Sequence, residues 1–435
     1  MKIAVIGTGY VGLVAGTCFA DMGNDVICID INEEKIRMLN EGKVPIFEPG
    51  LEPLIKKNVK AGRLFFTKDF DDAIVKSDIV FIAVGTPPRP KGDADLSYVE
   101  NCARGIAAVA KKPKIVVEKS TVPVQTCERI IQILDCNDGD GNGKCIKHEV
   151  VSNPEFLREG SAVKDFLEPD RIVIGTESEH ARKIMQQLYA PLKSKILFTD
   201  IKSAEIIKHA SNSFLAAKIS FINAVASICE KTGADIGMVA EGMGLDKRIG
   251  KTFLNAGIGY GGYCFPKDAE AFVRIAEKNG YDFKLLREVQ AINDAQKKNF
   301  VKKVEDALWN LNGKTICVLG LAFKPDTDDM RFAPSIDIIN ELLGEGAKVK
   351  AFDPVAMENA KKIFGEKIEY CNDMYDALKG ADALLFLTEW NEFKKIDFAK
   401  AKKLLRQPFV FDGRNMFNPK EMRSMGFKYS SIGRI

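Results

Sequence analysis

The chain has 435 residues, more than one ordinary core holds, and this length predicts two or three domains. Its 63 Lys and Arg nearly balance 60 Asp and Glu without long blocks of one sign, which argues against nucleic-acid and membrane-surface partners. The ten cysteines form no CxxC pair, so we expect free thiols, without a disulfide frame or a metal site. No leader precedes the first strand pattern, which favours a cytosolic protein.

Short β-branched runs alternate with helical patterns through the first 200 residues. Such alternation is typical of an α/β fold with a doubly wound parallel sheet. Residues 1–200 are therefore predicted to form the first domain. Its strands are expected at 2–6, 26–30, 79–84, 115–119, 149–152 and 171–175.

A long helix is predicted from about Ser203, where apolar residues begin to recur every three or four positions. Its other faces are apolar too, and a helix that is apolar nearly all round is buried between domains or subunits. The most apolar part, 214–229, contains Lys218 and is shorter than the roughly 20 residues of a membrane helix. We therefore expect a core helix within a helical region, 201–305. The main apolar stripe is Ile206, Ala210, Phe214, Ala217, Phe221, Val225 and Ile228.

Strand patterns return near residue 315 and define a third region, 306–435. They predict a second, smaller α/β unit whose architecture could match that of the first. Its strands are expected at 315–319, 349–352, 384–387 and 409–411, with a helix at 335–343.

A glycine-rich turn, GTGYVG at 7–12, follows the first predicted strand and opens a helix. Such a GxGxxG pattern lets backbone amides approach a pyrophosphate at a helix N-terminus, although glycines also mark ordinary packing turns. Asp30 ends the second strand, where a carboxylate accepts hydrogen bonds from a ribose 2′-hydroxyl and repels a 2′-phosphate. This favours NAD over NADP. Asp30 could also cap the helix that starts near Asn32.

The segment 253–268, FLNAGIGYGGYCFPKD, places a glycine run ahead of Cys264 and a helix start near Pro266. A helix N-terminus stabilises a thiolate, and its amides could hold an oxyanion. Cys264 is therefore a candidate nucleophile, with Asp268 four residues further on. The plain alternative is an inert packing cysteine behind a flexible surface loop.

Lys208 and Asn212 lie four residues apart on the long helix and therefore share one face. A lysine buried there loses hydration and needs a partner or a task. The alternative is a lysine that snorkels out to solvent.

Nine segments resemble, in order and nearly end to end, the UDP-glucose/GDP-mannose dehydrogenase family, and within it most closely the branch that oxidises UDP-glucose. The resemblance implies an N-terminal NAD-binding Rossmann domain, a central helical dimerisation region and a C-terminal Rossmann-like domain that binds the UDP-sugar. The segments are KIAVIGTGYVGLV, VPIFEPGL, VGTPP, EKSTVPV, SNPEFLREG, KHASNSFLA, GYGGYCFPKD, GLAFKPDTDDMR and FDGRN. GLAFKP replaces GxGxxG in the second unit, which suggests a different mode of nucleotide binding.

The implied reaction converts UDP-glucose to UDP-glucuronate, a four-electron oxidation that uses two NAD. An aldehyde forms first, and Cys264 adds to it to give a thiohemiacetal. A second hydride transfer then gives a thioester, which water hydrolyses.

The resemblance assigns further catalytic roles. Lys208 and Asn212 would stabilise the alkoxide or oxyanion, and Asp268 would position water or assist proton transfer. Glu155 would be the base for hydrolysis, with Thr121 ordering the water. Each residue taken alone also has a structural explanation that needs no catalytic role. Thr121 precedes a loop proline, Glu155 could cap a helix and Asp268 suits a helix N-terminus.

The resemblance also implies binding residues. Arg248 would reach the substrate of the neighbouring subunit, so that a homodimer completes the site. Lys324 and Arg331 could instead form surface ion pairs with nearby aspartates. The implied cofactor-binding residues are Gly7, Gly9, Tyr10, Val11, Gly12, Asp30, Lys35, Thr86, Thr121, Glu159, Lys267 and Arg331. The implied substrate-binding residues are Glu155, Phe156, Leu157, Lys208, Asn212, Arg248, Phe253, Leu254, Asn255, Gly257, Gly261 and Lys324.

Two features depart from the family pattern. Tyr263 stands where a small serine is common, which could narrow the site. Residues from Asp138 to Glu149 satisfy the D-x-D-x-N-G-x5-E calcium-loop spacing, but a strand pattern follows in place of a second helix. A solvated turn is therefore favoured over a calcium site.

Alternative functions stay open. A dehydrogenase acting on GDP-mannose or a UDP-N-acetylhexosamine would use the same chemistry. A catalytically idle NAD-binding regulator would not need Cys264, Lys208, Asn212 and Asp268 together, and a two-electron hydroxyacid dehydrogenase would not need the cysteine.

Overall fold

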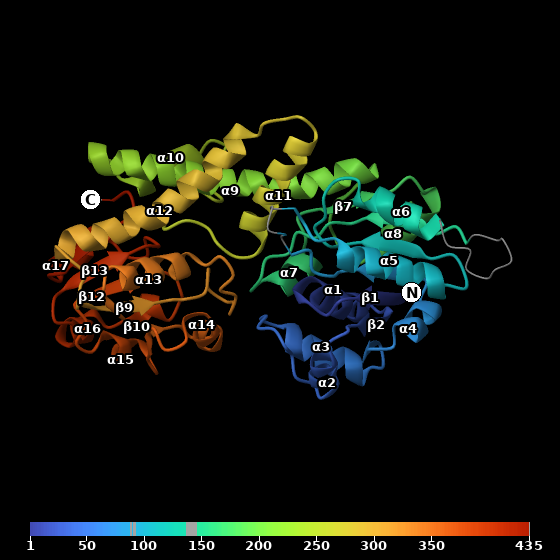
Figure 1. Cartoon of the computed structure of the whole chain (residues 1–435), viewed down its shortest axis with the longest axis horizontal. Helices are drawn as coiled ribbons and strands as arrows, with labels where there is room; N and C mark the ends of the chain where they lie inside the picture. The colour runs from blue at the N-terminus through green and yellow to red at the C-terminus, as the bar shows by residue number, and fades with distance from the viewer. Residues whose placement is uncertain (88, 90–92, 136–145, 435) are drawn as a thin grey trace. The chain divides into compact units, whose positions relative to one another are not determined.

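The computed structural model describes residues 1–87, 89, 93–135 and 146–434 (Figure 1). The chain forms two compact units, residues 1–211 with 270–279 and residues 212–269 with 280–435. Two helices, α9 (Ile201–Thr232) and α11 (Cys264–Lys278), contribute residues to both units.

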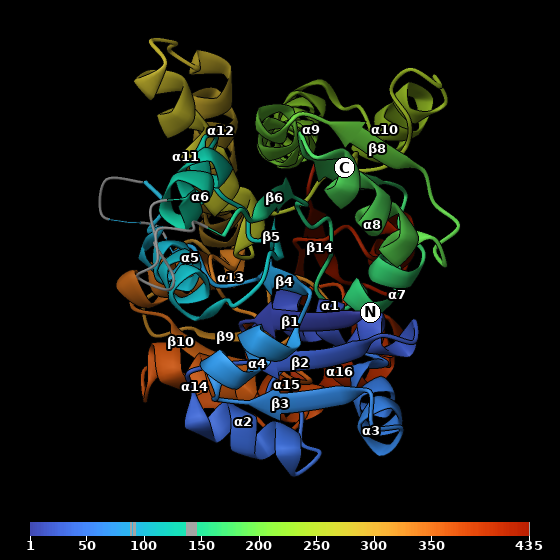
Figure 2. The same ribbon diagram turned by 90° about the vertical axis from the view of Figure 1, so that its right-hand side faces the viewer.

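The first unit is built on an eight-stranded sheet in the order β3-β2-β1-β4-β5-β6-β7-β8. Figure 2 shows β3, β2, β1 and β4 side by side in this order. The first six positions have the strand order of a dinucleotide-binding fold. All strand pairs are parallel except β6 and β7, which form one antiparallel pair at Ser152 and Gly175. The strands are β1 (Lys2–Ile6), β2 (Asp25–Ile29), β3 (Leu64–Thr67), β4 (Ile79–Ile82), β5 (Ile115–Glu118), β6 (Glu149–Ser152), β7 (Ile172–Gly175) and β8 (Ile196–Thr199).

Helices cover both faces of this sheet. Because alternate strand residues point to opposite faces, Ile3 and Val5 join one core and Ala4 and Ile6 the other. The first core includes residues of α1, α2, α3, α7 and α8, and the second includes residues of α4, α5 and α6. These helices are α1 (Tyr10–Asp21), α2 (Glu33–Asn40), α3 (Leu51–Lys60), α4 (Phe70–Lys76), α5 (Ser97–Val109), α6 (Thr126–Asp135), α7 (Ala162–Leu167) and α8 (Glu179–Tyr189).

The second unit contains a six-stranded, fully parallel sheet in the order β11-β10-β9-β12-β13-β14, which repeats the strand order of the first. Its strands are β9 (Thr315–Leu319), β10 (Lys348–Phe352), β11 (Glu369–Tyr370), β12 (Ala383–Phe386), β13 (Phe409–Asp412) and β14 (Lys428–Ser431). Its other helices are α10 (Ile236–Gly244), α12 (Lys284–Leu308), α13 (Pro334–Gly344), α14 (Met357–Phe364), α15 (Met374–Leu378), α16 (Phe398–Leu404) and α17 (Pro419–Ser424), with a 3-10 turn at Phe393–Lys395.

The predicted fold class is confirmed, with two parallel Rossmann-like sheets and a long central helix. The strands that the sequence did not reveal, β3, β8, β11 and β14, are the outer strands of the two sheets. Each is only two to four residues long, and each has exposed or half-buried positions. Such strands lack the continuous apolar run of a strand buried on both faces, which is the signal that marked the central strands.

Helix α9 has 32 residues, so it is longer than the apolar stretch from which we expected a core helix. By length and composition alone it could cross a membrane, with a window of mean hydropathy 1.3, of which 44% is buried. The core helix of a folded protein passes the same test. Its buried Glu205, Lys208 and His209 have polar partners inside the first unit, which fits a core helix.

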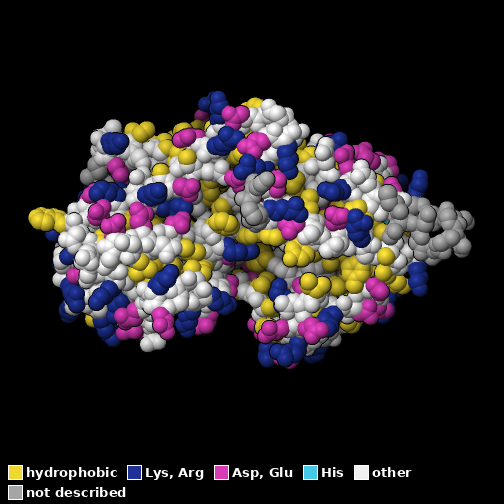
Figure 3. Space-filling model, viewed as in Figure 1, with side chains coloured by type: hydrophobic (Ala, Val, Ile, Leu, Met, Phe, Trp, Pro, Cys, Tyr) yellow, Lys and Arg dark blue, Asp and Glu magenta, His cyan; other side chains and the backbone are white. Residues whose placement is uncertain are grey.

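Charged side chains of both signs are interspersed over the face drawn in Figure 3. This agrees with the nearly balanced composition. Most of the ion pairs among the described residues are exposed, as for Lys56 and Glu52, and each contributes little to stability.

Phe19 of α1 lies at the centre of the first core, with its ring 4.8 Å from that of Phe81 and 5.1 Å from that of Phe166. Phe19→Ala is expected to lower the free energy of unfolding by about 3–5 kcal/mol, because it leaves a cavity in a packed core. Phe65→Ala removes a half-exposed ring from β3 and should cost less than about 1 kcal/mol. Urea unfolding measures both, and equal losses would contradict the assigned core.

Candidate functional site

Polar loops of the first unit follow the carboxyl ends of its strands. In such sheets ligands bind where the strand order reverses, here between β1 and β4. The 7–12 loop follows β1, Thr86 follows β4, Thr121 follows β5 and Glu155 follows β6. Thr86 Oγ1 donates a hydrogen bond of 2.9 Å to Thr121 O, which ties two of these loops together.

The 7–12 loop is packed tightly at two of its glycines and open at the third. Gly7 has a φ of +101°, and a Cβ added to it would lie 2.5 Å from Ala83 O. A Cβ on Gly12 would lie 1.9 Å from Gly7 O, whereas one on Gly9 would meet no atom within 4 Å. Gly9 precedes α1, and Tyr10 and Val11, half-buried, begin it. The loop therefore leaves the N-terminus of α1 accessible to a pyrophosphate.

Asp30 follows β2 and lies beside this loop. Its Oδ2 accepts hydrogen bonds from Thr8 N at 2.8 Å and Thr8 Oγ1 at 2.7 Å, and its Oδ1 accepts one from Asn32 N at 2.9 Å. Burial raises the pKa of Asp30, but these hydrogen bonds outweigh it and hold the pKa below its ordinary value. The ionised, half-buried carboxylate fits a ribose 2′-hydroxyl. Asn32 caps α2 by accepting from Lys35 N at 3.0 Å, so the capping alternative for Asp30 is wrong.

A buried ion pair joins α9 to the loop after β6. Lys208 Nζ lies 2.8 Å from Glu155 Oε1, and the two side chains are 4% and 5% exposed. The lysine therefore does not snorkel to solvent. Glu155 Oε2 accepts from Leu157 N at 2.5 Å within a turn, so Glu155 does not cap a helix. The Phe156 ring lies 5.3 Å from Lys208 Nζ and 3.8 Å from the Arg171 guanidinium.

Glu155 also lines a cavity of about 220 Å³, together with Lys119, Asn153 and Phe156. Lys119 Nζ donates to Asn153 O at 3.3 Å and to Asn153 Oδ1 at 3.1 Å. Burial lowers the pKa of Lys119 to about 8, although the charge of Glu155 opposes the shift. Lys119 lies within the EKSTVPV segment, and no pattern in that segment predicted a role for it.

Glu48, in VPIFEPGL, is another functional candidate that no sequence pattern predicted. It accepts a hydrogen bond from the Tyr10 hydroxyl, and its carboxylate also accepts from Gly160 N at 2.6 Å and Ala162 N at 2.7 Å. The charge of the half-buried Glu159 acts on the same tyrosine. Glu48 therefore connects the start of α1 to the loop that bears Glu155. An acidic residue eight positions after the end of α2 gives no local signal of such a long-range contact.

In the second unit, Cys264 is the first residue of α11 and is partly exposed, whereas the other described cysteines are buried. The predicted thiol at a helix N-terminus is confirmed. Asp268 is fully buried on the same helix, and its Oδ2 accepts from Asn212 Nδ2 at 2.6 Å. Its Oδ1 lies 2.9 Å from Lys267 Nζ. These contacts give Asp268 specific partners, beyond a general preference for a helix N-terminus.

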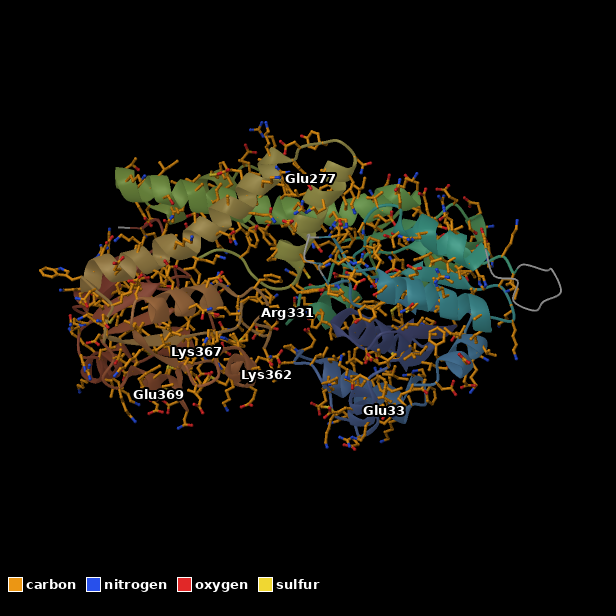
Figure 4. All side chains as sticks on the ribbon, in the orientation of Figure 1. Glu33, Glu277, Arg331, Lys362, Lys367 and Glu369 are labelled. Carbon is orange, nitrogen blue, oxygen red and sulfur yellow. The ribbon has the colours of Figure 1, made fainter. Side chains whose placement is uncertain are left out.

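Tyr263 contacts the two cations that were expected near the cofactor. The Arg331 guanidinium lies 4.3 Å from the centre of its ring, and Lys267 Nζ lies 5.4 Å from it. Arg331, on the loop between β9 and α13 (Figure 4), also pairs with Asp329 at 2.7 Å, so the ion-pair alternative holds in part. Lys324 Nζ lies 5.5 Å from the Phe323 ring.

The glycine run ahead of Cys264 is buried and hydrogen-bonded. Gly257 N donates to Asn223 Oδ1 at 2.9 Å, and a Cβ on Gly261 would lie 2.3 Å from Phe332 O. The flexible-loop alternative is therefore wrong. Of the other predicted substrate residues, Leu254 is buried, Phe253 half-buried and Asn255 exposed. The Arg248 side chain is 89% exposed and pairs with Asp246 at 2.6 Å.

The loop after β9 differs from its counterpart after β1. Asp353, which follows β10, is 1% exposed, and its Oδ2 accepts from Leu321 N at 2.7 Å and Ala322 N at 3.1 Å. The Trp390 indole also donates to this oxygen, at 3.1 Å. The amides that would meet a phosphate already have a partner, which agrees with a different mode of nucleotide binding in this unit.

Most of the calcium-like spacing, residues 138–145, lies outside the described residues. Glu149, its distal carboxylate, is described. It accepts from Ala181 N at 3.0 Å and contacts Ser178 and His180 at the start of α8. Glu149 thus has partners within the first unit.

The contrast between Gly9 and Gly12 gives a test of the 7–12 loop. Gly12→Ala should lower both thermal stability and NAD affinity, because its Cβ would overlap Gly7 O. Gly9→Ala should keep the melting temperature within about 2 °C and still weaken NAD binding by about tenfold or more, because the methyl group enters the space left for a pyrophosphate. Calorimetric titration with NAD measures the affinity. Unchanged binding by Gly9→Ala would place the dinucleotide elsewhere.

Comparison with known proteins matches three family models along the chain. Residues 1–193 match the NAD-binding domain of the UDP-glucose/GDP-mannose dehydrogenase family, residues 202–295 its central domain and residues 317–419 its UDP-binding domain. UDP-glucose 6-dehydrogenase TuaD of Bacillus subtilis is 51% identical over 433 residues, which cover 100% of this chain and 93% of that relative. A UDP-glucose 6-dehydrogenase of Rhizobium meliloti is 48% identical over 100% of both chains.

Solved structures agree with these matches. A UDP-glucose dehydrogenase from Pyrobaculum islandicum superposes with a TM-score of 0.93 at 38% identity, over 100% of this chain and 98% of the other. A UDP-D-ManNAc dehydrogenase from Pyrococcus horikoshii gives 0.88 at 29% identity, over 100% and 99%. The chain therefore belongs to the UDP-glucose/GDP-mannose dehydrogenase family, and its first 193 residues form an NAD-binding domain.

Proposed function

We propose that the protein is a UDP-glucose 6-dehydrogenase that oxidises UDP-glucose to UDP-glucuronate through a thioester on Cys264. The observation that supports this most directly is a partly exposed thiol at the first residue of α11, one turn before a buried Asp268 with two polar partners. A nucleophile at a helix N-terminus beside a proton-handling carboxylate suits thioester chemistry. Full-length relatives named UDP-glucose 6-dehydrogenase support the substrate.

The proposed steps balance as two oxidations and one hydrolysis. When bound, NAD supplies the hydride acceptor for each oxidation. The first oxidation breaks a C6–H bond and removes the hydroxyl proton, with Asp268 assisting, to leave an aldehyde. The Cys264 thiolate then adds to the aldehyde carbon, and the resulting thiohemiacetal loses a second hydride to become a thioester.

In the last step, water attacks the thioester, a C–O bond forms and the C–S bond breaks, so that the Cys264 thiolate leaves. Glu155 takes the proton of the water, and Thr121 orders that water. Glu155 already accepts hydrogen bonds from Lys208 and Leu157, but each carboxylate oxygen has a second lone pair with which to meet the water.

Two neighbouring residues of α9 stabilise negative charge in this proposal. Lys208 and Asn212 are one turn apart on one face of the helix, so their donors point to the same side. An ammonium and an amide held in a buried setting stabilise an alkoxide or an oxyanion more than they would in water. Their contacts to Glu155 and Asp268 fix the side chains in advance.

The binding assignments extend this proposal. We place NAD on the 7–12 loop with Asp30, and UDP-glucose against 155–157, 253–261 and Lys324. A rival in which GDP-mannose or a UDP-N-acetylhexosamine is the substrate keeps the same chemistry, and one structural neighbour is named as a UDP-D-ManNAc dehydrogenase. A catalytically idle regulator would not need a thiol with this setting.

The yield of NADH tests the proposal. Wild-type protein should form two NADH per UDP-glucose consumed, because the product is an acid. Cys264→Ala should lose turnover by about a thousandfold or more, since the covalent route is closed. Absorbance at saturating NAD, with GDP-mannose and UDP-N-acetylhexosamines in parallel, measures the stoichiometry.

Cys102→Ala on α5 is the matched control, because this buried thiol lies outside the proposed site. Two NADH from a different sugar would transfer the assignment to that sugar and keep the mechanism. One NADH per sugar would exclude the four-electron reaction.

We also propose a homodimer, placed in the cytosol, in which α9 forms the interface. Phe214, Phe221 and Ile228 lie at steps of seven on α9, and they are 68%, 55% and 60% exposed in the single chain. An exposed apolar stripe of this kind on a long helix is typical of a subunit interface. Arg248, whose side chain is 89% exposed, would then reach the substrate of the partner subunit.

Phe221→Glu should convert the dimer to a monomer, because it places a charge in the centre of an apolar interface. Activity should fall at least tenfold if the site needs Arg248 from the second subunit. Light scattering coupled to gel filtration gives the mass. Met425→Glu, on an exposed apolar residue of the second unit, is the control. A fully active monomer would contradict the shared site.

A further inference from the structure

Helix α9 contains buried polar residues beyond the two that bear the proposed chemistry. Glu205 is 2% exposed and His209 is 1% exposed, and their spacing places them on the same side of the helix as Lys208. Neither residue is assigned a part in the reaction above. Burial of a carboxylate and an imidazole is costly unless both have partners.

The partners of Glu205 lie where the Thr121 loop turns into α6. Glu205 Oε2 accepts from Gln125 N at 2.8 Å, and Oε1 accepts from Cys127 N at 2.9 Å. α6 begins at Thr126, so these amides are among the N–H groups that a helix start leaves without partners. A carboxylate at this end also suits the helix dipole.

The turn that Glu205 holds is a strained one. Gln125 has a φ of +75°, in the left-handed region that a residue with a side chain adopts only at a cost of about 1 kcal/mol or more. Such a conformation persists where surrounding contacts fix it. The hydrogen bond from Gln125 N to Glu205 is one such contact.

His209 holds the other end of the same loop. Its Nε2 lies 2.8 Å from Val122 O, and because a carbonyl only accepts, Nε2 has the proton and donates it. The ring stacks on Phe272 at 5.9 Å. Val122 follows Thr121 directly, so this bond fixes the backbone next to the residue that orders water in the proposed mechanism.

We propose that Glu205 and His209 are positioning residues that clamp the 120–127 loop to α9 and thereby hold Thr121 in the place needed for thioester hydrolysis. The same helix bears Lys208, which holds Glu155. One rigid element thus fixes both groups that handle the hydrolytic water. The inference rests on the proposed function for its kinetic consequence, but the clamp itself is a property of the first unit.

The test compares Glu205→Gln and His209→Phe with wild type. Glu205→Gln keeps the shape of the side chain but offers one acceptor oxygen in place of two, and His209→Phe keeps the stacked ring but loses the donor. Both should retain a first burst of two NADH per active site while steady-state kcat falls about tenfold or more, because only hydrolysis is slowed. KM for UDP-glucose should stay within about threefold, and mass spectrometry should find the acyl adduct on the Cys264 peptide.

Glu128→Gln is the matched control. Glu128 pairs with Lys202 at 2.9 Å and so also joins α6 to α9, but at the surface, and it does not contact the 120–127 loop through its side chain in any hydrogen bond of the described residues. Wild-type kinetics are expected for it. If burst and steady-state rates fall by the same factor in the clamp variants, or if kcat is unchanged in both, the proposal is overturned.

Hydrogen exchange of the holoenzyme supplies a readout that does not need turnover. Amides of residues 120–127 should exchange faster in both variants and at the wild-type rate in Glu128→Gln; unchanged protection in the variants would overturn the clamp. If wild type makes no NADH from UDP-glucose, the proposed function fails while exchange still decides the clamp. Should Glu205→Gln not fold, His209→Phe alone gives the same two outcomes.

Discussion

The buried ion pair between Lys208 and Glu155 constrains the backbone of the first unit. Both side chains are about 95% buried, and an isolated charge at such a depth costs several kcal/mol. Removal of either partner would leave the other uncompensated, a loss of about 3–5 kcal/mol. The pair is therefore tolerable only if the backbones of α9 and of the loop after β6 are fixed before any ligand arrives. Ile201 of α9, which packs in the second core of the first unit, and the hydrogen-bond network through Asn153 contribute to this rigidity.

The two sheets show how one backbone plan yields two kinds of site. In each sheet the strand order reverses beside the first strand, β1 or β9. The loop that follows this strand has amides that point away from the sheet. An aspartate after the second strand contacts that loop in both units. Asp30 stays half-buried and contacts one residue of the loop, so the start of α1 remains open. Asp353 is buried and accepts hydrogen bonds from two loop amides and an indole. The corresponding loop of the second unit is therefore closed to a phosphate. The two loops therefore differ in how many of their amides already have a partner within the protein.

Much of this arrangement was predictable from sequence, and the limits have physical causes. The central strands, the 7–12 turn and the start of α11 at Cys264 follow from local signals, because apolar runs, glycine spacing and a proline act over a few residues. The outer strands were missed because their burial is partial. The polar contacts were missed for another reason: Glu48 and Glu205 meet partners 114 and 80 residues away, and no local pattern encodes such distances. Resemblance to the family named Lys208 and Glu155 but not their ion pair.

The positions of its buried polar residues explain the unusual composition of α9. Lys208 and His209 lie three and four residues after Glu205, and Asn212 lies four and three residues after them, so the four residues form one polar stripe on a largely apolar helix. By hydropathy the helix resembles a membrane span, yet lipid could not satisfy a carboxylate, an ammonium, an imidazole and an amide on one side. Within the protein each finds a partner: Gln125 and Cys127 for Glu205, Glu155 for Lys208, Val122 for His209 and Asp268 for Asn212. The apolar remainder excludes water from these contacts, which strengthens them. The apolar residues of α9 thus keep water away from the polar ones, and the polar contacts are strong because water is kept away.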